Sequence, residues 1–526
     1  MMGRTKSKKS RPHIAIIGAG ISGLSAAAIL SRSMPVTVFE RSSQPGGKIR
    51  TERIGNECID AGPTVFTMAP IFEEIFVAAG GRLSDYLTLS KLDEIAKHFW
   101  SDGDRLSLFG QQSKNVEAIR QFAGARDALA YQKFMHKAKH SWETLYPRFL
   151  RGPTGSFLGM LAETNPLDLL RLDPYTTYWR SLSRIFDDPR LRQLFGRYST
   201  YCGSSPFKAS STLSLISHVE QKGVWIIDGG MIALANALET VASNNGAVFK
   251  YDADARILSN TRDNICTITD GIEEQTFDAV LYSGDISALQ ENDTTSASAS
   301  NRSQSAITWC FSGDHVSSDF SVHNVFFSSN YKDEFRDVFE HERPPENPTV
   351  YVFAPDRGKA PTCDPTGQTH ATRADPNRTA PNHTEGIDHI ASRRSDPTAP
   401  NERFFCLINA PANGDSHTYS DQELEQCRIN AFNQIQRCGA SLNPLLHTMT
   451  TTTPATFAAR FPGTGGALFG PPSHGWVAPF RRSGVRKKAR QLYCAGGSVH
   501  PGSGLPMAAL SGLTAAKTAM SDFGLT

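Results

Sequence analysis

Three glycines near the start of the chain have the spacing that binds a phosphate group. Gly18, Gly20 and Gly23 form a G-x-G-x-x-G motif directly after an apolar run at residues 14–17. The first glycine allows a tight turn, the second lets a pyrophosphate approach the backbone, and the third lets a helix pack on a strand. A helix over residues 24–30 would point its N-terminus at the phosphates. The motif therefore predicts a dinucleotide site.

A carboxylate at the right distance completes this motif. Glu40 lies twenty residues beyond Gly20, at the end of a second apolar run over residues 36–39. An acidic side chain there accepts hydrogen bonds from an adenosine ribose. It also disfavours a 2′-phosphate, which argues against NADP.

The C-terminal region carries an independent signal. Residues 493–497 predict a strand entering a glycine turn, and His500-Pro501-Gly502-Ser503-Gly504-Leu505-Pro506-Met507 leads into a small-residue helix over residues 508–519. Such a turn presents backbone N–H groups and a helix dipole to an anionic or electron-rich ligand.

These motifs resemble those of the bacterial carotenoid (phytoene) desaturases. The resemblance rests on Pro45-Gly46-Gly47-Lys48, on Asp60-Ala61-Gly62-Pro63-Thr64-Val65 and on the H-P-G-x-G-x-P pattern from His500. It runs along nearly the whole chain. Residues 323–327, 349–352, 407–411 and 473–476 are most similar to the 1-hydroxycarotenoid 3,4-desaturases (methoxyneurosporene dehydrogenases) within that family.

The resemblance implies FAD as cofactor and a set of residues that hold it. Beside the three glycines and Glu40, the implied positions are Gly47, Lys48, Gly62, Thr64, Val65, Ala255, Ser283, Gly497, Gly504, Pro506 and Met507. Ala255 and Ser283 depart from the residues usual in the family. His500 is the candidate catalytic residue, although a structural histidine is an equal alternative, and no general base is assigned. Ser498, His500 and Ser503 are candidates to recognise a substrate hydroxyl.

The resemblance implies an α/β fold class. The expected fold combines a doubly wound, Rossmann-like FAD-binding domain (residues 11–80, 222–290 and 485–526) with a helical, membrane-facing cap (81–221). A sheet-based substrate domain (291–360 and 404–484) and a disordered insertion (361–403) complete it. The insertion is rich in proline and poor in large aliphatic residues, so it buries too little apolar surface to offset its ordering entropy. Residues 294–305 look unstructured for a similar reason.

Composition narrows the range of partners. The 526 residues carry a net charge of +2, which gives no reason to expect nucleic acid. Nine cysteines without C-x-x-C spacing fit a reducing cytoplasm and predict no metal site. A basic run of Arg4, Lys6, Lys8, Lys9 and Arg11 is either a solvated tail or a contact to anionic lipid. With no long apolar run, we expect a cytoplasmic protein bound peripherally to the inner membrane.

The expected activity is FAD-dependent removal of two hydrogens across C3–C4 of a 1-hydroxy- or 1-methoxy-carotenoid, with quinone or oxygen as electron acceptor. Phytoene desaturation and carotenoid isomerisation on the same fold are the nearer alternatives. A flavin amine oxidase, an NAD dehydrogenase and a non-catalytic carotenoid-binding flavoprotein are more distant ones.

Overall fold

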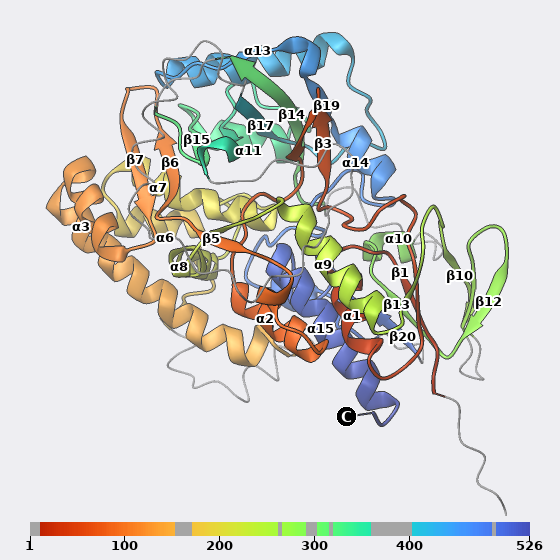
Figure 1. Cartoon of the computed structure of the whole chain (residues 1–526). Coiled ribbons are helices and arrows are strands. Elements are labelled where there is room, and N and C mark those ends of the chain that lie inside the picture. The colour runs from red at the N-terminus through yellow and green to blue at the C-terminus, as the bar shows by residue number, and fades with distance from the viewer. Residues whose placement is uncertain are drawn as a thin grey trace, which may run out of the picture.

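The computed structural model describes residues 11–152, 171–260, 266–290, 302–314, 319–358, 402–486 and 491–525. Two sheets and a layer of helices make up this part of the chain (Figure 1). A small parallel sheet with its helices lies at the lower right of the view, a larger sheet lies at the top beneath α13 (Asp421–Arg437), and a helical layer lies on the left.

The parallel sheet holds the first glycine motif. Its strand order is β20-β13-β1-β2-β9, and every neighbouring pair is parallel. The strands are β1 (Ile14–Ile17), β2 (Val36–Phe39), β9 (Val248–Lys250), β13 (Ala279–Tyr282) and β20 (Leu492–Cys494). The predicted strands at residues 14–17 and 36–39 are therefore confirmed.

Both faces of this sheet are covered, which explains why the central strand β1 is apolar at every position. Ile14 and Ile16 pack on one face against the helices α1 (Ile21–Leu30), α9 (Met231–Asn244) and α15 (Leu505–Asp522). Ala15 and Ile17 pack on the other face against an antiparallel sheet of β10 (Arg256–Asn260), β11 (Cys266–Thr269) and β12 (Glu274–Phe277).

The larger sheet has the order β18-β14-β17-β16-β15-β6-β7, with β19 also paired to β14. All its pairs are antiparallel except β6 with β15. The strands are β6 (Glu94–Phe99), β7 (Arg105–Phe109), β14 (Ser305–Asp314), β15 (His323–Phe326), β16 (Val350–Phe353), β17 (Glu402–Ala410), β18 (Asn443–Pro444) and β19 (Thr450–Thr452). Phe311, Phe326 and Phe404 pack in one cluster with Ile435 of α13.

Two predicted boundaries are wrong in detail. Residues 89–109, expected in the helical cap, form β5 (Leu89–Lys91), β6 and β7, and two of these strands extend the larger sheet. The ends of both predicted disordered segments are also ordered. Glu402 and Arg403 begin β17, and Ser303, Gln304 and Ser305 are buried around the start of β14. The rest of the predicted insertion, residues 361–401, lies outside the described residues.

The helical layer consists of α3 (Gln112–Leu145), α6 (Tyr178–Ile185), α7 (Pro189–Gly196), the short 3-10 segment η3 (Arg197–Cys202) and α8 (Leu215–Lys222). Its core is aromatic, with Tyr131, Phe134, Phe186 and Phe195 buried together. The described residues contain no helix with both the length and the apolar character needed to cross a membrane.

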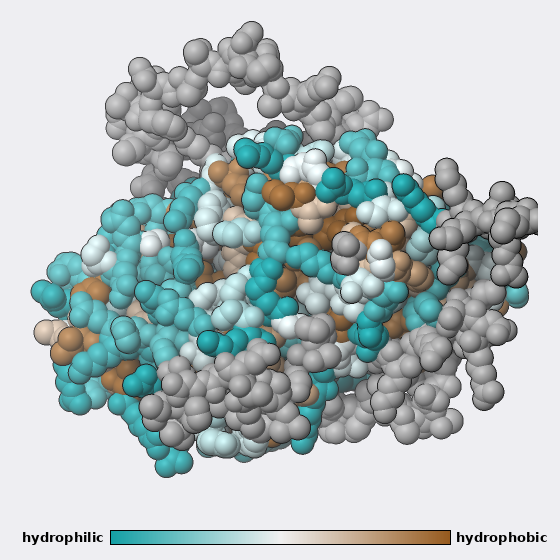
Figure 2. All heavy atoms as spheres, turned by 90° about the horizontal axis from the view of Figure 1, so that it is seen from below, coloured by the Kyte–Doolittle hydropathy of each residue, from teal (hydrophilic) through white to brown (hydrophobic). Residues whose placement is uncertain are grey.

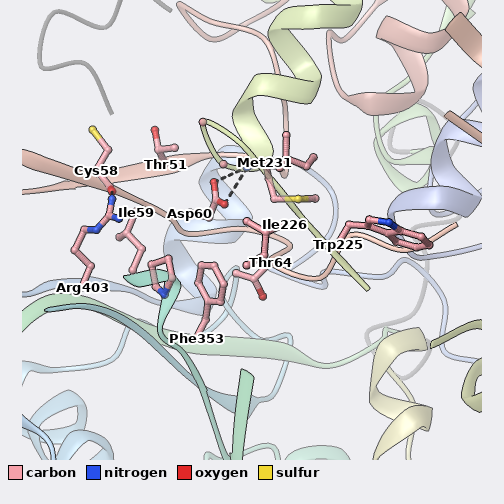
Figure 3. A pocket seen from close by; sticks show the side chains of 14 residues that line it. Thr51, Cys58, Ile59, Asp60, Thr64, Trp225, Ile226, Met231, Phe353 and Arg403 are labelled. Carbon is pink, nitrogen blue, oxygen red and sulfur yellow. Dashed lines mark hydrogen bonds between the residues drawn. The ribbon is translucent and has the colours of Figure 1, made fainter. Parts of the chain in front are cut away.

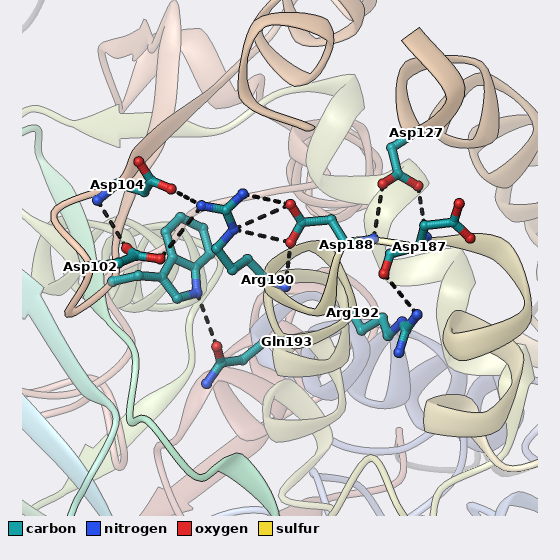
Figure 4. Close-up of polar contacts among 9 residues, drawn as sticks. Asp102, Asp104, Asp127, Asp187, Asp188, Arg190, Arg192 and Gln193 are labelled. Carbon is teal, nitrogen blue, oxygen red and sulfur yellow. Dashed lines mark hydrogen bonds and ion pairs between the residues drawn. The ribbon is translucent and has the colours of Figure 1, made fainter. Parts of the chain in front are cut away.

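A charged network ties the β6–β7 hairpin to the start of α7 (Figure 4). Arg190 is paired with Asp188 and with Asp102 and Asp104 of the hairpin turn. Nearby, the two carboxylate oxygens of Asp127 accept the backbone N–H groups of Asp187 and Asp188, both at 2.9 Å. The sheet and the helical layer are thus joined by hydrogen-bonded charges as well as by packing.

Shorter elements complete the described chain. They are the hairpin β3 (Thr51–Ile54) and β4 (Glu57–Asp60), α2 (Ala69–Ala78), β8 (Trp225–Ile227), which pairs with β5, α10 (Ile286–Gln290), α11 (Tyr331–Phe339) and α14 (Pro454–Arg460).

Candidate active site

A cavity of about 1160 Å³ opens at the carboxyl ends of the parallel strands and continues to the larger sheet. Ile17, Glu40 and Ser283, which end or follow β1, β2 and β13, line one part of it. Thr308 of β14 and Leu407 of β17 line another part. Ligands of doubly wound folds bind at this edge of the sheet. The volume exceeds that of a pocket for one drug-sized molecule, about 300–1,000 Å³.

The glycine turn has the geometry that its sequence predicts. Gly20 is the N-cap of α1, and a Cβ atom built on it would meet nothing within 4 Å. Gly18 has φ +100°, a conformation that favours glycine. A Cβ on Gly23 would lie 2.0 Å from the carbonyl oxygen of Gly18, so the third glycine serves close packing. The turn leaves room beside Gly20 and uses Gly23 to hold helix and strand together.

The second glycine cluster lies directly against the first. The N–H of Gly46 donates to the carbonyl of Ala19 at 2.9 Å, and a Cβ on Gly47 would approach Cα of Gly20 to 3.0 Å. Gly47 and Gly20 both line the cavity. The two turns therefore form one wall of the cavity, although Gly20 and Gly47 are 27 residues apart in the sequence.

Glu40 connects this wall to the end of β2. The carboxylate is buried, with one oxygen accepting the N–H of Ala19 at 2.6 Å and the other accepting the N–H of Ser42 at 2.9 Å. A carboxylate offers about four acceptor positions. Two of them therefore remain for hydroxyl groups of a ligand, and Glu40 lines the cavity.

These features fit FAD. The open space at Gly20, the helix N-terminus behind it and the acceptor positions on Glu40 match a pyrophosphate beside a ribose. Most residues implied by the resemblance also line the same cavity: Gly47, Lys48, Gly62, Thr64, Val65, Ala255, Ser283, Gly497, Gly504 and Pro506. Ser283 Oγ and Ser22 Oγ are hydrogen bonded at 2.7 Å.

Three predicted site residues do not line the cavity. Gly23 is inside α1, and Met507 packs against the core around the parallel sheet. His500, the candidate catalytic residue, is completely buried, and its Nε2 lies 2.8 Å from the carbonyl oxygen of Phe149. Burial lowers the pKa of His500 to about 4, so its imidazole is neutral. The structure therefore gives this histidine a packing position and brings no reacting group to it.

Lys48 is held inside the cavity wall. Its Nζ donates to the carbonyl oxygen of Leu468 at 2.7 Å and lies 5.3 Å from the ring centre of Phe461. Burial lowers the pKa of Lys48, and Asp285 opposes that effect. This side chain links the second glycine cluster to the loop that follows α14.

Sequence reasoning missed a chain of polar side chains in the wall. Thr64 Oγ1 and the Tyr351 hydroxyl lie 2.7 Å apart, and the same hydroxyl lies 2.7 Å from Nδ1 of His323. Burial lowers the pKa of His323 to about 3. Thr64 and Tyr351 line the cavity, so hydrogen bonds run from the wall to a neutral, buried imidazole. In the sequence, Tyr351 stands out only as part of the desaturase-like stretch 349–352.

A second polar group in the same cavity also escaped notice. It consists of Arg197, Tyr201 and Glu220, which come from η3 and α8 and are surrounded by apolar lining residues. Those apolar residues include Ile216, Val219, Val325, Phe405, Leu407 and Phe457. Away from the glycine turns the wall thus combines apolar side chains with polar ones, among them Thr308, Thr349 and Asn409.

A small pocket of about 40 Å³ lies behind the β3–β4 hairpin. Figure 3 shows Asp60 at the end of β4 pointing to the start of α9, where both its oxygens accept the N–H of Met231 at 3.0 and 2.9 Å. Burial raises the pKa of Asp60 to about 7, opposed by the Met231 hydrogen bond and by Arg403. This contact fixes the hairpin that carries Gly62, Thr64 and Val65 toward the cavity.

Comparison with known proteins identifies the family. The model of the flavin containing amine oxidoreductases matches residues 21–319. A hydroxyneurosporene desaturase of Rubrivivax gelatinosus is 37% identical, with 98% of this chain and 95% of that protein covered. A hydroxyneurosporene desaturase of Rhodobacter capsulatus is 35% identical over 98% of this chain and 99% of its own length.

Solved structures agree on the fold. An oxidoreductase from Methanosarcina mazei has a TM-score of 0.58 at 12% identity, covering 96% of this chain and all of that one. A fatty acid isomerase from P. acnes that produces CLA has a TM-score of 0.55 at 12% identity, covering 99% and 100%. These likenesses confirm the predicted α/β flavoprotein fold, and the family match confirms the predicted cofactor class.

The match over nearly the whole chain confirms the resemblance found in the sequence. The protein is a flavin-dependent oxidoreductase: it belongs to the flavin containing amine oxidoreductase family, and hydroxyneurosporene desaturases match it over nearly its whole length.

Proposed function

We propose that the protein removes two hydrogens across C3–C4 of a carotenoid whose end carries a 1-hydroxy or 1-methoxy group, such as hydroxyneurosporene. The product gains one conjugated double bond. The observation that carries this proposal is the name shared by relatives that match from end to end at 33–37% identity. A 1-hydroxycarotenoid 3,4-desaturase of a Flavobacterium species, 26% identical over 94% of this chain, points to the same reaction class.

The cavity suits such a substrate. Its part away from the glycine turns includes apolar side chains, and each CH₂ group buried against them contributes about 0.8 kcal/mol. A bound flavin supplies the hydride acceptor. Gly20 and Glu40 would hold that cofactor, and Val325, Phe405 and Leu407, which line the cavity, would exclude water from it.

We further propose that the protein works at the cytoplasmic face of the inner membrane, bound peripherally, and passes electrons to quinone or oxygen. The insolubility of a carotenoid motivates this placement, together with the basic run at residues 4–11, of which residues 1–10 lie outside the described chain. Figure 2 shows hydrophobic residues gathered near the middle of one face, among hydrophilic ones. Carbonate should release the protein from membranes, and resistance to carbonate would indicate an integral anchor.

Pigment conversion tests the reaction. Membranes containing the protein are supplied with 1-hydroxyneurosporene in one sample and phytoene in another. The hydroxylated pigment should lose two mass units and absorb further to the red, while phytoene stays colourless. Rapid conversion of phytoene with an inert hydroxylated pigment would overturn the proposed substrate. A change of absorption without a change of mass would indicate an isomerase.

A further inference from the structure

Aromatic side chains lie open at a surface outside the cavity. Tyr175 is 71% exposed, and its ring centre lies 5.0 Å from that of Trp476 in an edge-to-face contact. Trp476 begins the apolar run Trp476-Val477-Ala478-Pro479-Phe480, in which every residue is only partly buried. None of these residues lines the cavity. Apolar and aromatic side chains gathered at a surface indicate a contact with a partner.

Three segments of the chain converge beside this aromatic pair. Phe149, Leu172 and Phe480 pack in one small cluster, with the ring centres of Phe149 and Phe480 5.1 Å apart. Tyr175 follows Leu172 by three residues, and Trp476 precedes Phe480 by four. The exposed pair, the apolar run and the cluster therefore share one region of the surface.

Positive charge surrounds the same region. Arg148, Arg171 and Arg481 are the sequence neighbours of the three clustered residues, and all three arginines are exposed. Residues 112–222, which include the helical layer, carry 16 Lys and Arg against nine Asp and Glu, a net charge of +7. The entire chain carries +2, so the remaining residues are acidic on balance. The basic charge is thus concentrated on the layer that supplies two of these arginines.

Resting on the proposed peripheral binding, we propose that this region docks on an anionic lipid bilayer. The docking patch consists of Tyr175, residues 476–480, Arg148, Arg171 and Arg481. Trp and Tyr side chains favour the boundary between headgroups and acyl chains, because their rings are apolar and their N–H or O–H stays hydrated. Arginines beside them attract acidic headgroups. The helical layer therefore faces the bilayer, and docking does not depend on the basic run at the N-terminus.

The docking patch lies close to the cavity. Phe149 is in edge-to-face contact with His500, and the same loop continues to Ser503, which lines the cavity. Leu215 packs against the cluster of Phe149 and precedes Ile216, another lining residue. A bilayer held against the patch thus brings a water-insoluble substrate next to the cavity that would receive it.

Sedimentation with lipid vesicles tests the inference. Full-length, FAD-loaded protein is mixed with vesicles of phosphatidylcholine alone or of equal parts of phosphatidylcholine and phosphatidylglycerol, and the wild type should bind the anionic vesicles more tightly. R148Q/R481Q should lower that affinity about 25-fold, since each arginine near an anionic surface contributes about fivefold. Y175S/W476S should lower it about tenfold, because the rings that enter the boundary are lost.

Control variants show whether the position of the charge matters. R53Q/R336Q removes the same charge from exposed positions on β3 and α11 and should bind like the wild type. K6Q/K8Q/K9Q neutralises the N-terminal run and should keep most of the binding. Flavin absorbance reports whether each variant is folded and loaded.

Quenching by brominated lipid shows directly whether the patch meets the bilayer. Brominated phosphatidylcholine in the anionic vesicles should quench the tryptophan fluorescence of the wild type, and less of it should be quenched in W476F. Equal quenching in W476F, equal binding of the wild type to neutral and anionic vesicles, or a loss of binding confined to K6Q/K8Q/K9Q would overturn the inference.

Pigment conversion in detergent separates this inference from the proposed reaction. In micelles, which replace the bilayer, R148Q/R481Q should convert 1-hydroxyneurosporene at the wild-type rate. Failure of both proteins to convert it, with vesicle binding that depends on the patch, would defeat the proposed reaction and leave the docking patch standing. Conversion by a wild type that does not bind anionic vesicles would defeat the docking patch alone.

Discussion

The carboxylate of Asp60 holds the backbone N–H of Met231 with both of its oxygens, across 171 residues of sequence. This contact joins the β3–β4 hairpin to the start of α9, so it fixes the segment that carries Thr64 to the cavity.

Replacing Asp60 should change how stability depends on pH. The pKa of Asp60 is raised to about 7 from an ordinary value near 3.8, so the folded state holds its proton more tightly than the unfolded chain. The contribution of this proton to the free energy of unfolding is therefore fully present below about pH 4 and is lost as the pH rises through 7. When the free energy of unfolding is measured by urea titration between pH 5 and 8, its change with pH should be smaller in Asp60→Asn than in the wild type. Part of the pH dependence should remain in this variant, because burial also raises the pKa of Glu334 to about 7. An identical slope in Asp60→Asn would contradict this account.

The second and third glycines of the motif, Gly20 and Gly23, should fail in different ways when they are enlarged. Gly20→Val points a side chain into open space, so the protein should fold but lose its yellow colour, because the space for the pyrophosphate is filled. Gly23→Ala places Cβ 2.0 Å from a backbone oxygen and should prevent a stable fold. Chromatography of the cofactor released on denaturation and circular dichroism separate the two. Bound FAD in Gly20→Val would refute the placement of the phosphates.

Glu40→Ala should weaken FAD binding by about 1.5–3 kcal/mol, because a charged acceptor is lost. The Ala19 and Ser42 amides also lose their common partner, which loosens the glycine turn. Titration of the apoprotein with FAD, followed by flavin fluorescence, gives the change. Glu40→Gln, which keeps one acceptor oxygen, serves as the control and should lose less. Unchanged affinity in Glu40→Ala would leave this residue a role in the turn only.

His500→Gln should alter acid stability and leave the pigment reaction running. The pKa of His500 is lowered to about 4 by burial, whereas the unfolded imidazole has its ordinary value of 6.5. The unfolded chain therefore binds the extra proton first, and stability, complete above pH 6.5, falls as the pH drops toward 4. Glutamine does not titrate, so the melting temperature of the variant should change less between pH 6.5 and pH 4 than that of the wild type. Loss of turnover with wild-type stability would restore a catalytic role.

Removal of residues 362–400 should preserve FAD content and activity. The flanking strands β16 and β17 are antiparallel neighbours, with Phe353 opposite Phe405, so their ends can be joined by a short turn. Loop length carries a small entropic cost. A soluble, yellow deletion variant without turnover would show that the segment has a function.

Elements of the fold could be predicted from the sequence where a short local pattern determines them. Four apolar residues before a glycine turn predicted β1, and its neighbours in space pack as that pattern requires. Within the misassigned residues 89–109, β6 and β7 form a local hairpin that was overlooked. The pairing that joins this hairpin to the larger sheet is between β6 and β15, more than two hundred residues later, and no local pattern records it.

The same reason explains which site residues were missed or misplaced. His500 follows a motif that suggested chemistry, but its burial depends on Phe149, 351 residues away. Arg197 belongs to no motif in the sequence, and only folding brings it close to Glu220 in the wall of the cavity.

The order of the strands has a consequence for biosynthesis. The sheet that carries the glycine turn begins with residues 14–17, yet its edge strand β20 ends at Cys494. The ribosome must therefore release nearly the whole polypeptide before that sheet can close. Until then β13 lacks its neighbour β20, and one face of the sheet lacks its covering helix α15, and partly covered sheets of this kind are prone to aggregate. Truncation before residue 492 should deliver the product to chaperones or proteases, and slow translation of the last segments should lower the yield of the yellow protein.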